Sequence, residues 1–365
     1  TGAVLAPGIL EIFSGRAEGA IAVCAAGNAG NSQVPVLIFD LVGGGNIAGT
    51  NVIVGSKGGQ LDYLGQGQYR TIGVPTENEP SRVGVNNECG LAFHPNSPLL
   101  SGIKLHAQKS TLDAVDGTVY CATSMDDTKN NPFSPIYWLA RGGLAGTLLP
   151  IIGASPGSTG GNSDAPRDSI DPTKAPTLVR SPEDSRNLVD AGRLATLLAI
   201  DKNPNKRAVQ KVMAAVNAMS ESQLVKFKAQ DLPAQVRELV NCGYLNSSDY
   251  LNQFDADNLD PTKDDVIKKL FGKLGTDDLE KKAGTITKLV VDGYAGAGVI
   301  SLPGFDYHDS TRKEQSTLDS LAGEMIGRAL EYAAIKKRSL MIYIFTDGGI
   351  ASAANADVMA DEKFL

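Results

Sequence analysis

The chain has 365 residues, a formal net charge of −7 and a pI near 5.1. An acidic chain has no basic surface with which to neutralise phosphates, so these values exclude a general nucleic-acid-binding protein. A hydrophobic content of 42% and a charged content of 21% are typical of a globular protein. No apolar run approaches the roughly 20 residues needed to cross a bilayer, so the sequence predicts no transmembrane segment.

The first 33 residues form a separate region. Residues 1–10 are small and apolar, like the end of the hydrophobic region of a signal peptide. Either this region is a signal remnant or it is a flexible arm. In both cases we expect the folded domain to span residues 34–365.

The domain begins with a predicted buried strand at residues 34–42, followed by the glycines 43–45. Glycines permit positive φ angles and close approach of the backbone to a ligand. The turn lacks the Gly-Lys-Ser/Thr of a phosphate-binding loop and the third glycine of the dinucleotide fingerprint, which argues against a dinucleotide-dependent oxidoreductase. Asp40, near the end of the strand, is either a metal ligand or a structural hydrogen-bonding group. Thr50 is the hydroxyl best placed beyond this strand to act as a nucleophile.

Four cysteines lie at positions 24, 89, 121 and 242, without the Cys-x-x-Cys spacing of zinc or thioredoxin-type sites. Cys89 and Cys121 are expected to form a disulfide if the protein is exported. The alternative is that they are buried free thiols.

The middle of the chain divides into a loop and a helical insert. Residues 151–182 are rich in Gly, Ser, Pro and Asp, which predicts a loop. Ser181 and Pro182, followed by two acidic residues, predict the start of a helix. We expect a helical insert over residues 183–291.

The last part of the chain predicts a strand-helix-strand unit. A short apolar strand at Val299–Leu302 leads into a loop with Asp306 and His308, and a helical pattern spans residues 313–337. The continuous apolar run 339–345 predicts a strand buried on both faces of a parallel sheet, and Asp347 follows it. The sequence therefore predicts a doubly wound α/β fold with a mostly parallel sheet. Both acidic turns are expected at the carboxyl ends of its strands, where such sheets bind ligands.

Three motifs, in this order, resemble those of one known family. They are Leu41–Asn46, His94-Pro95 and Gly304–His308, of which Gly-Phe-Asp-x-His is the most specific. The chain resembles the exported bacterial proteins of the domain-of-unknown-function family fifteen-oh-one, in the alkaline-phosphatase/sulfatase superfamily. The resemblance extends from residue 34 to residue 349.

The resemblance implies an alkaline-phosphatase-like α/β fold and a location in the periplasm or outside the cell. It also implies a divalent metal ion, zinc or calcium, that helps to hydrolyse a phosphate or sulfate ester of a small molecule or a polysaccharide. Asp and His are suitable ligands for such ions. The expected ligands are Asp40, Asp306, His308 and Asp347, and the expected nucleophile is Thr50.

The chain also departs from the family pattern. Asn46 or its neighbour stands where the family has an acid, residues 131–134 lack the histidine of a Ser-His-Phe segment, and Gly348 stands where many members of the superfamily have a metal-binding histidine. A second hypothesis is therefore a non-catalytic exported protein that keeps the fold and functions in structure or self-assembly.

Overall fold

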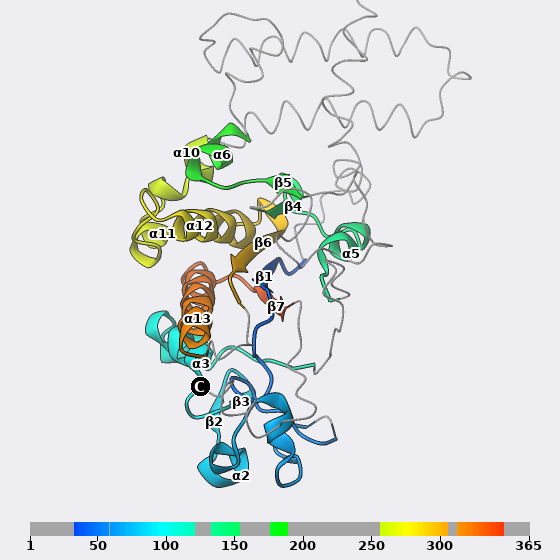
Figure 1. The fold of residues 1–365 in the computed structure, drawn as a ribbon. Helices are drawn as coiled ribbons and strands as arrows, with labels where there is room; N and C mark the ends of the chain where they lie inside the picture. Colours follow the sequence, from blue (N-terminus) through cyan, green and yellow to red (C-terminus); the bar gives the residue numbers. More distant parts are fainter. Residues whose placement is uncertain are drawn as a thin grey trace, which may run out of the picture.

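The structure is a computed structural model that describes residues 33–57, 59–120, 133–153, 176–188, 256–305 and 312–346. The centre of the described fold is a parallel sheet with the strand order β5-β4-β6-β1-β7 (Figure 1). Its strands have the following bounds: β1 Val36–Val42, β4 Leu149–Gly153, β5 Thr177–Leu178, β6 Ala295–Pro303 and β7 Met341–Thr346.

The position of β1 confirms the predicted parallel arrangement. β1 pairs in parallel with β6 on one side and with β7 on the other. Leu41 lies opposite both Leu302 and Thr346, so the three strands end at the same edge of the sheet. The prediction of an α/β fold with these three strands in one parallel sheet is thus confirmed.

Helices cover both faces of the sheet, as Figure 1 shows. Alternate residues of β1 point to opposite faces. Leu37, Phe39 and Leu41 pack in a large core with α3, α12 and α13, whereas Val36 and Ile38 pack in a smaller core with α5. The helices have these bounds: α2 Pro80–Val83, α3 Pro98–His106, α4 Lys109–Leu112, α5 Ile136–Arg141, α6 Pro182–Asn187, α10 Ala256–Leu259, α11 Asp265–Leu270, α12 Asp278–Val291 and α13 Arg312–Ile335. Short 3-10 helices lie at Gln68–Ile72, Thr76–Asn78 and Pro261–Lys263.

β7 differs from its prediction in one respect. The apolar run predicted a strand buried on both faces, but β7 lies at the edge of the described sheet and most of its side chains are half-buried or exposed. Met341 is 51% exposed. An uninterrupted apolar run identifies the strand but does not determine its place in the sheet, because that place depends on which other strands pair with it.

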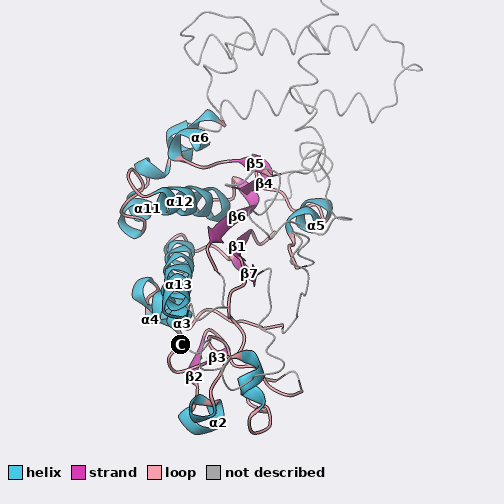
Figure 2. Ribbon diagram, in the orientation of Figure 1, coloured by secondary structure: helices cyan, strands magenta, loops and turns pink. Residues whose placement is uncertain are grey.

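Between β1 and α5 the chain makes a long excursion to one side of the sheet, drawn mostly as loop in Figure 2. It contains a two-stranded hairpin of β2, Asn86–Glu88, and β3, Leu91–Phe93. The excursion returns to the main core through α3, which packs along α13.

Glycines allow α3 and α13 to pack closely. A Cβ atom added to Gly323 of α13 would lie 2.1 Å from the carbonyl oxygen of Leu99, and one added to Gly102 of α3 would lie 2.1 Å from that of Ser320. Gly327 meets the carbonyl oxygen of Ile103 in the same way, at 2.4 Å. Any side chain at these positions would push the two helices apart.

The predicted middle segments are described only in part. Most of the loop 151–182 and much of the insert 183–291 lie outside the described residues, as do residues 1–32. The predicted helix start is confirmed, because the Ser181 hydroxyl accepts a hydrogen bond from the backbone N–H of Asp184 at 3.2 Å. The searched part of the chain contains no helix with the length and apolar character required to cross a membrane.

The α3–α13 contact generates a prediction about stability. Gly323→Ala should lower the free energy of unfolding by about 1–3 kcal/mol, because the new methyl group must displace backbone atoms. Gly275→Ala is the matched control, since a Cβ atom there meets no atom of the described residues within 4 Å. Urea unfolding of the two variants checks this, and equal stability of both would contradict the close contact.

Candidate functional site

Hydrogen bonds join the ends of three strands at the carboxyl edge of the sheet. The backbone N–H of Phe305, just after β6, donates to the carbonyl oxygen of Val42 at 3.0 Å. On the other side of β1, the hydroxyl of Thr346 donates to the carbonyl oxygen of Leu41 at 2.9 Å and accepts from the N–H of Gly45 at 2.6 Å. The glycine turn therefore contacts the chain that leaves β6 and the last residue of β7.

Gly43 makes this arrangement possible. Its φ angle is +109°, and a Cβ atom added to it would lie 1.8 Å from the carbonyl oxygen of Phe305. The close approach that the glycines permit is thus an approach to the neighbouring loop of the protein. A ligand approach, which the sequence suggested for this turn, is not needed to explain Gly43.

Asp40 lies near the carboxyl end of the central strand and is fully buried. It comes two positions after Ile38, so it lies on the same face of the sheet, which α5 covers. Its register partners are Ser301 on β6 and Phe345 on β7. A buried carboxylate is costly unless it is paired, hydrogen-bonded or bound to a metal, so its presence in an otherwise apolar strand calls for a specific role.

The other three expected metal ligands, Asp306, His308 and Asp347, lie outside the described residues. What the structure provides is the position of their neighbours in the sequence. Phe305 precedes Asp306 and Thr346 precedes Asp347, and both contact the end of β1. Within the described ranges no group of three His, Cys, Asp or Glu side chains is suitably placed to hold a metal ion.

Thr50, the expected nucleophile, is fully buried. Its hydroxyl donates to the carbonyl oxygen of Asn46 at 2.8 Å. This bond closes a turn of the backbone, which is a structural use of the hydroxyl. Attack on a substrate requires the hydroxyl to leave this bond and to become accessible.

Asn51 is the centre of a buried network that the sequence analysis missed. Its Nδ2 donates to the carbonyl oxygen of Asn46 and to a carboxylate oxygen of Asp319 on α13, both at 2.8 Å. Its Oδ1 accepts from the Ser97 hydroxyl at 2.8 Å and from the N–H of Leu99 at 3.1 Å. The side chain of Asn51 thus joins the loop after β1 to the start of α3 and to α13. The only signal in the sequence is an Asn close to a glycine turn, which does not identify partners so distant in the chain.

Asn46 contrasts with Asn51. It is only 1% exposed, yet neither Oδ1 nor Nδ2 has a hydrogen-bond partner among the described residues. Its backbone carbonyl oxygen, by comparison, accepts two bonds. A buried amide without partners costs about 1–3 kcal/mol, so this side chain is an exception among buried polar groups.

His94 is a buried residue with both ring nitrogens engaged. Nε2 lies 3.1 Å from the carbonyl oxygen of Asn78, and Nδ1 accepts from the N–H of Asn96 at 3.1 Å. These contacts suit a neutral imidazole that carries its proton on Nε2. Burial lowers the pKa of His94, while the bond to Asn78 raises it in part. This geometry gives His94 a structural role in the turn.

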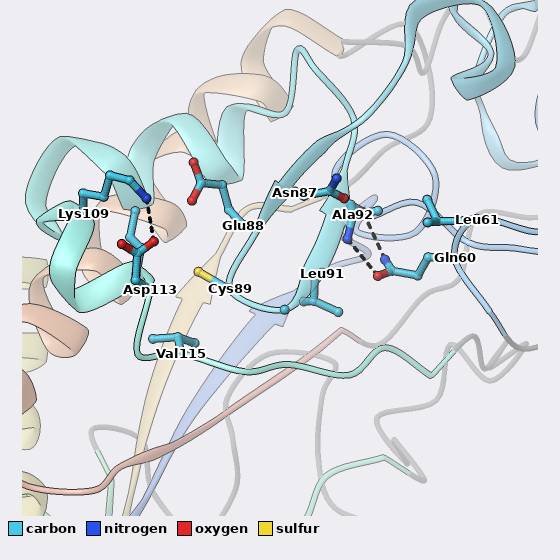
Figure 3. A pocket seen from close by; sticks show the side chains of 12 residues that line it. Gln60, Leu61, Asn87, Glu88, Cys89, Leu91, Ala92, Lys109, Asp113 and Val115 are labelled. Atoms are coloured by element: carbon cyan, nitrogen blue, oxygen red, sulfur yellow. Dashed lines mark hydrogen bonds and ion pairs between the residues drawn. The ribbon is translucent and has the colours of Figure 1, made fainter.

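A cavity of about 520 Å³ lies beside the β2–β3 hairpin, as Figure 3 shows. Its charged side chains are already paired, Lys109 with Asp113 at 2.6 Å and Glu88 with Lys104 at 2.9 Å. Cys89, which also lines it, is a buried free thiol whose pKa burial raises to about 11. Such a thiol is protonated at neutral pH and a poor nucleophile. Cys121 lies outside the described residues, so the Cys89–Cys121 disulfide stays a prediction.

A second buried group of ionisable side chains joins α11, α12 and α13. The hydroxyl of Tyr332 bonds to Asp264 and to Asp292, both at 3.0 Å. Lys288 pairs with Asp292 at 2.6 Å, and Lys336 pairs with Asp264 at 2.9 Å. Burial acts to raise the pKa of Asp264, but its bond to Lys336 and its other contacts lower it overall. The two carboxylates and two ammonium groups balance in charge, which is the pattern of a structural cluster.

Comparisons with protein-family models, with curated proteins and with solved structures give no match to this chain.

The geometry of His94 predicts a pH dependence of stability. Because its pKa is lowered in the folded protein, the unfolded state binds a proton more readily than the folded state. The contribution of His94 is therefore complete above the ordinary histidine pKa of about 6.5 and is lost as the pH falls below it. Urea unfolding between pH 5 and 8 should show this slope, and His94→Gln should flatten it. The control variant, His106→Gln, should keep the part of the slope that His94 produces. An unchanged slope in His94→Gln would contradict the assignment of a buried neutral imidazole.

Proposed function

We propose that the protein is a metal-dependent hydrolase of phosphate or sulfate esters that acts in the periplasm or outside the cell. The observation that carries the proposal is the meeting of three strand ends at the glycine turn. Phe305 and Thr346 both bond to the end of β1, and the residue that follows each of them is an aspartate. Asp40 lies on β1 itself, two residues before its end.

The proposed donors suit a divalent ion. Asp40, Asp306 and Asp347 supply carboxylate oxygens and His308 supplies a ring nitrogen, a mixed set that suits zinc and, through its oxygens, also calcium. An ion bound there supplies the positive charge that polarises a phosphoryl or sulfuryl oxygen. Binding of the ion would require ionised carboxylates and a neutral His308. Asp40 is fully buried, so water is excluded from its side of the site.

A second candidate function is a non-catalytic exported protein that keeps the fold and acts in structure or self-assembly. Two observations favour it. Asn46 provides a neutral amide near the position of the family's acid, and the Thr50 hydroxyl is buried in a bond to the Asn46 carbonyl. Both observations leave fewer acidic and nucleophilic groups for catalysis at the carboxyl edge of the sheet.

Metal binding separates the two candidates. The purified chain should retain zinc or calcium after dialysis, and Asp306→Ala and Asp40→Asn should each abolish this binding, since each removes one of few ligands. Asp265→Asn is the matched control, because the Asp265 side chain is 92% exposed on α11 and should not affect the ion. Elemental analysis of the dialysed proteins measures the metal content.

The result also decides the chemistry. If the wild type retains metal, it should hydrolyse an aryl phosphate or an aryl sulfate in a metal-dependent way. If the wild type binds neither zinc nor calcium after incubation with an excess of each, the hydrolase proposal is wrong. The non-catalytic candidate is then tested by sedimentation analysis of self-association.

A further inference from the structure

Two buried asparagines in the loop after β1 differ in one property. Asn46 and Asn51 are 1% and 0% exposed, and they lie only five residues apart. Asn51 uses both atoms of its amide, each in two hydrogen bonds. Asn46 uses neither atom in a bond to the described part of the chain. The described part of the chain thus provides partners for all polar atoms of the Asn51 amide and for none of the Asn46 amide.

The cost of an unpaired buried amide makes the position of Asn46 informative. A leucine has a similarly branched but somewhat larger side chain and would avoid the cost of burying two unpaired polar atoms. Residues that reduce stability in this way are expected at binding sites, where the free groups serve a ligand. Asn46 directly follows the glycine turn at the carboxyl edge of the parallel sheet, which is where open α/β sheets bind ligands.

We propose that the Asn46 amide is a ligand-binding group for a neutral ligand whose hydroxyls both donate and accept hydrogen bonds, as in a sugar or another polyol. The choice follows from the two atoms of the amide. A bare oxyanion pairs only with Nδ2 and is repelled by Oδ1, whereas a bare cation pairs only with Oδ1. Hydroxyl groups satisfy both atoms at once.

The charges near the turn support a neutral ligand. Asp319, whose carboxylate binds the Asn51 amide, is buried close to the Asn46 carbonyl that Asn51 also binds, and Asp40 is buried in the preceding strand. The Asp319 carboxylate near this loop opposes the binding of an anion by an uncharged amide alone. Because Asn46 is almost fully buried, a ligand reaches its side chain only if the chain around it moves.

The inference deepens the proposed function, because it assigns a contact to the alcohol part of a sugar ester. It rests on the proposed function only in naming an ester as the ligand. The binding of a hydroxyl by the amide needs no metal ion. A failure of metal binding would therefore leave it standing, and the experiment below uses no metal to detect the polyol.

Stability measurements on matched variants provide the first test. Asn46→Leu should raise the urea midpoint, because it removes an unpaired amide, whereas Asn51→Leu should lower it strongly, because it breaks four hydrogen bonds. If the larger leucine side chain prevents folding at position 46, the alanine pair decides. Asn46→Ala should then cost much less stability than Asn51→Ala. A loss of stability at position 46 equal to that at position 51 overturns the proposal, since it shows that the Asn46 amide has structural partners.

Ligand binding provides the second test. Thermal unfolding of the wild type is followed with glucose, glycerol, acetamide, inorganic phosphate and calcium chloride as separate probes. Glucose or glycerol should raise the melting temperature of the wild type more than that of Asn46→Leu, which also controls for the general stabilising effect of polyols. An Asn46-dependent response to acetamide alone identifies an amide ligand, and one to phosphate or calcium alone identifies an ion. Each of these, or no Asn46-dependent response to any probe, overturns the assignment of a polyol.

Discussion

The structure depends on how closely the turn after β1 approaches the chain that leaves β6. At Gly43 there is no space for a side chain, because the carbonyl oxygen of Phe305 occupies the position of a Cβ atom. The hydrogen bond from Phe305 to Val42 and the two bonds of the Thr346 hydroxyl hold the same turn from both sides. A larger residue at position 43 would separate the ends of β1 and β6. The strand ends that carry the candidate site residues would then no longer lie together at one edge of the sheet.

The loop beyond this turn is held by a second set of contacts, and these involve the helices. Asn51 connects the loop to Asp319 on α13 and to the start of α3. The glycines at the contact of α3 with α13 bring the two helices close enough for this network to form. The edge of the sheet and the helical layer are thus coupled through one amide side chain. The polar atoms of that side chain are satisfied, as buried polar atoms must be.

Those parts of the fold that depend on local pattern are predictable from the sequence. The apolar runs of β1, β6 and β7, their parallel arrangement and the Ser181 cap all follow from such patterns. The edge position of β7 does not, because an apolar run gives no information about which strands pair with it on each side. The Asn51–Asp319 bond is not predictable either, since its partners are 268 residues apart and neither belongs to a motif. The glycine turn is identified correctly, but the cause of its glycines is not. The sequence suggests close approach to a ligand, whereas the structure shows close approach to the protein's own backbone, and both require the same residue.

For the candidate site, the sequence supplies the residue types and the structure supplies their surroundings only in part. Asp40 is on the central strand and fully buried, and its role as a ligand stays a prediction. The unpaired amide of Asn46 cannot be recognised from the sequence, since burial and the lack of partners among the described residues are properties of the folded protein. Asn46 is thus one of the polar groups that the described fold satisfies least.

The pairing of β1 has a consequence for synthesis of the chain. Its partners, β6 and β7, begin at residues 295 and 341, so β1 is complete long before either exists. At the usual elongation rate of about 5–20 residues per second, β6 follows roughly 10–50 s later. During this time the apolar segment Val36–Val42 has both edges unpaired, and such segments are prone to aggregate. The central strand of the sheet is therefore a segment of the nascent chain that stays exposed to aggregation until β6 has been made.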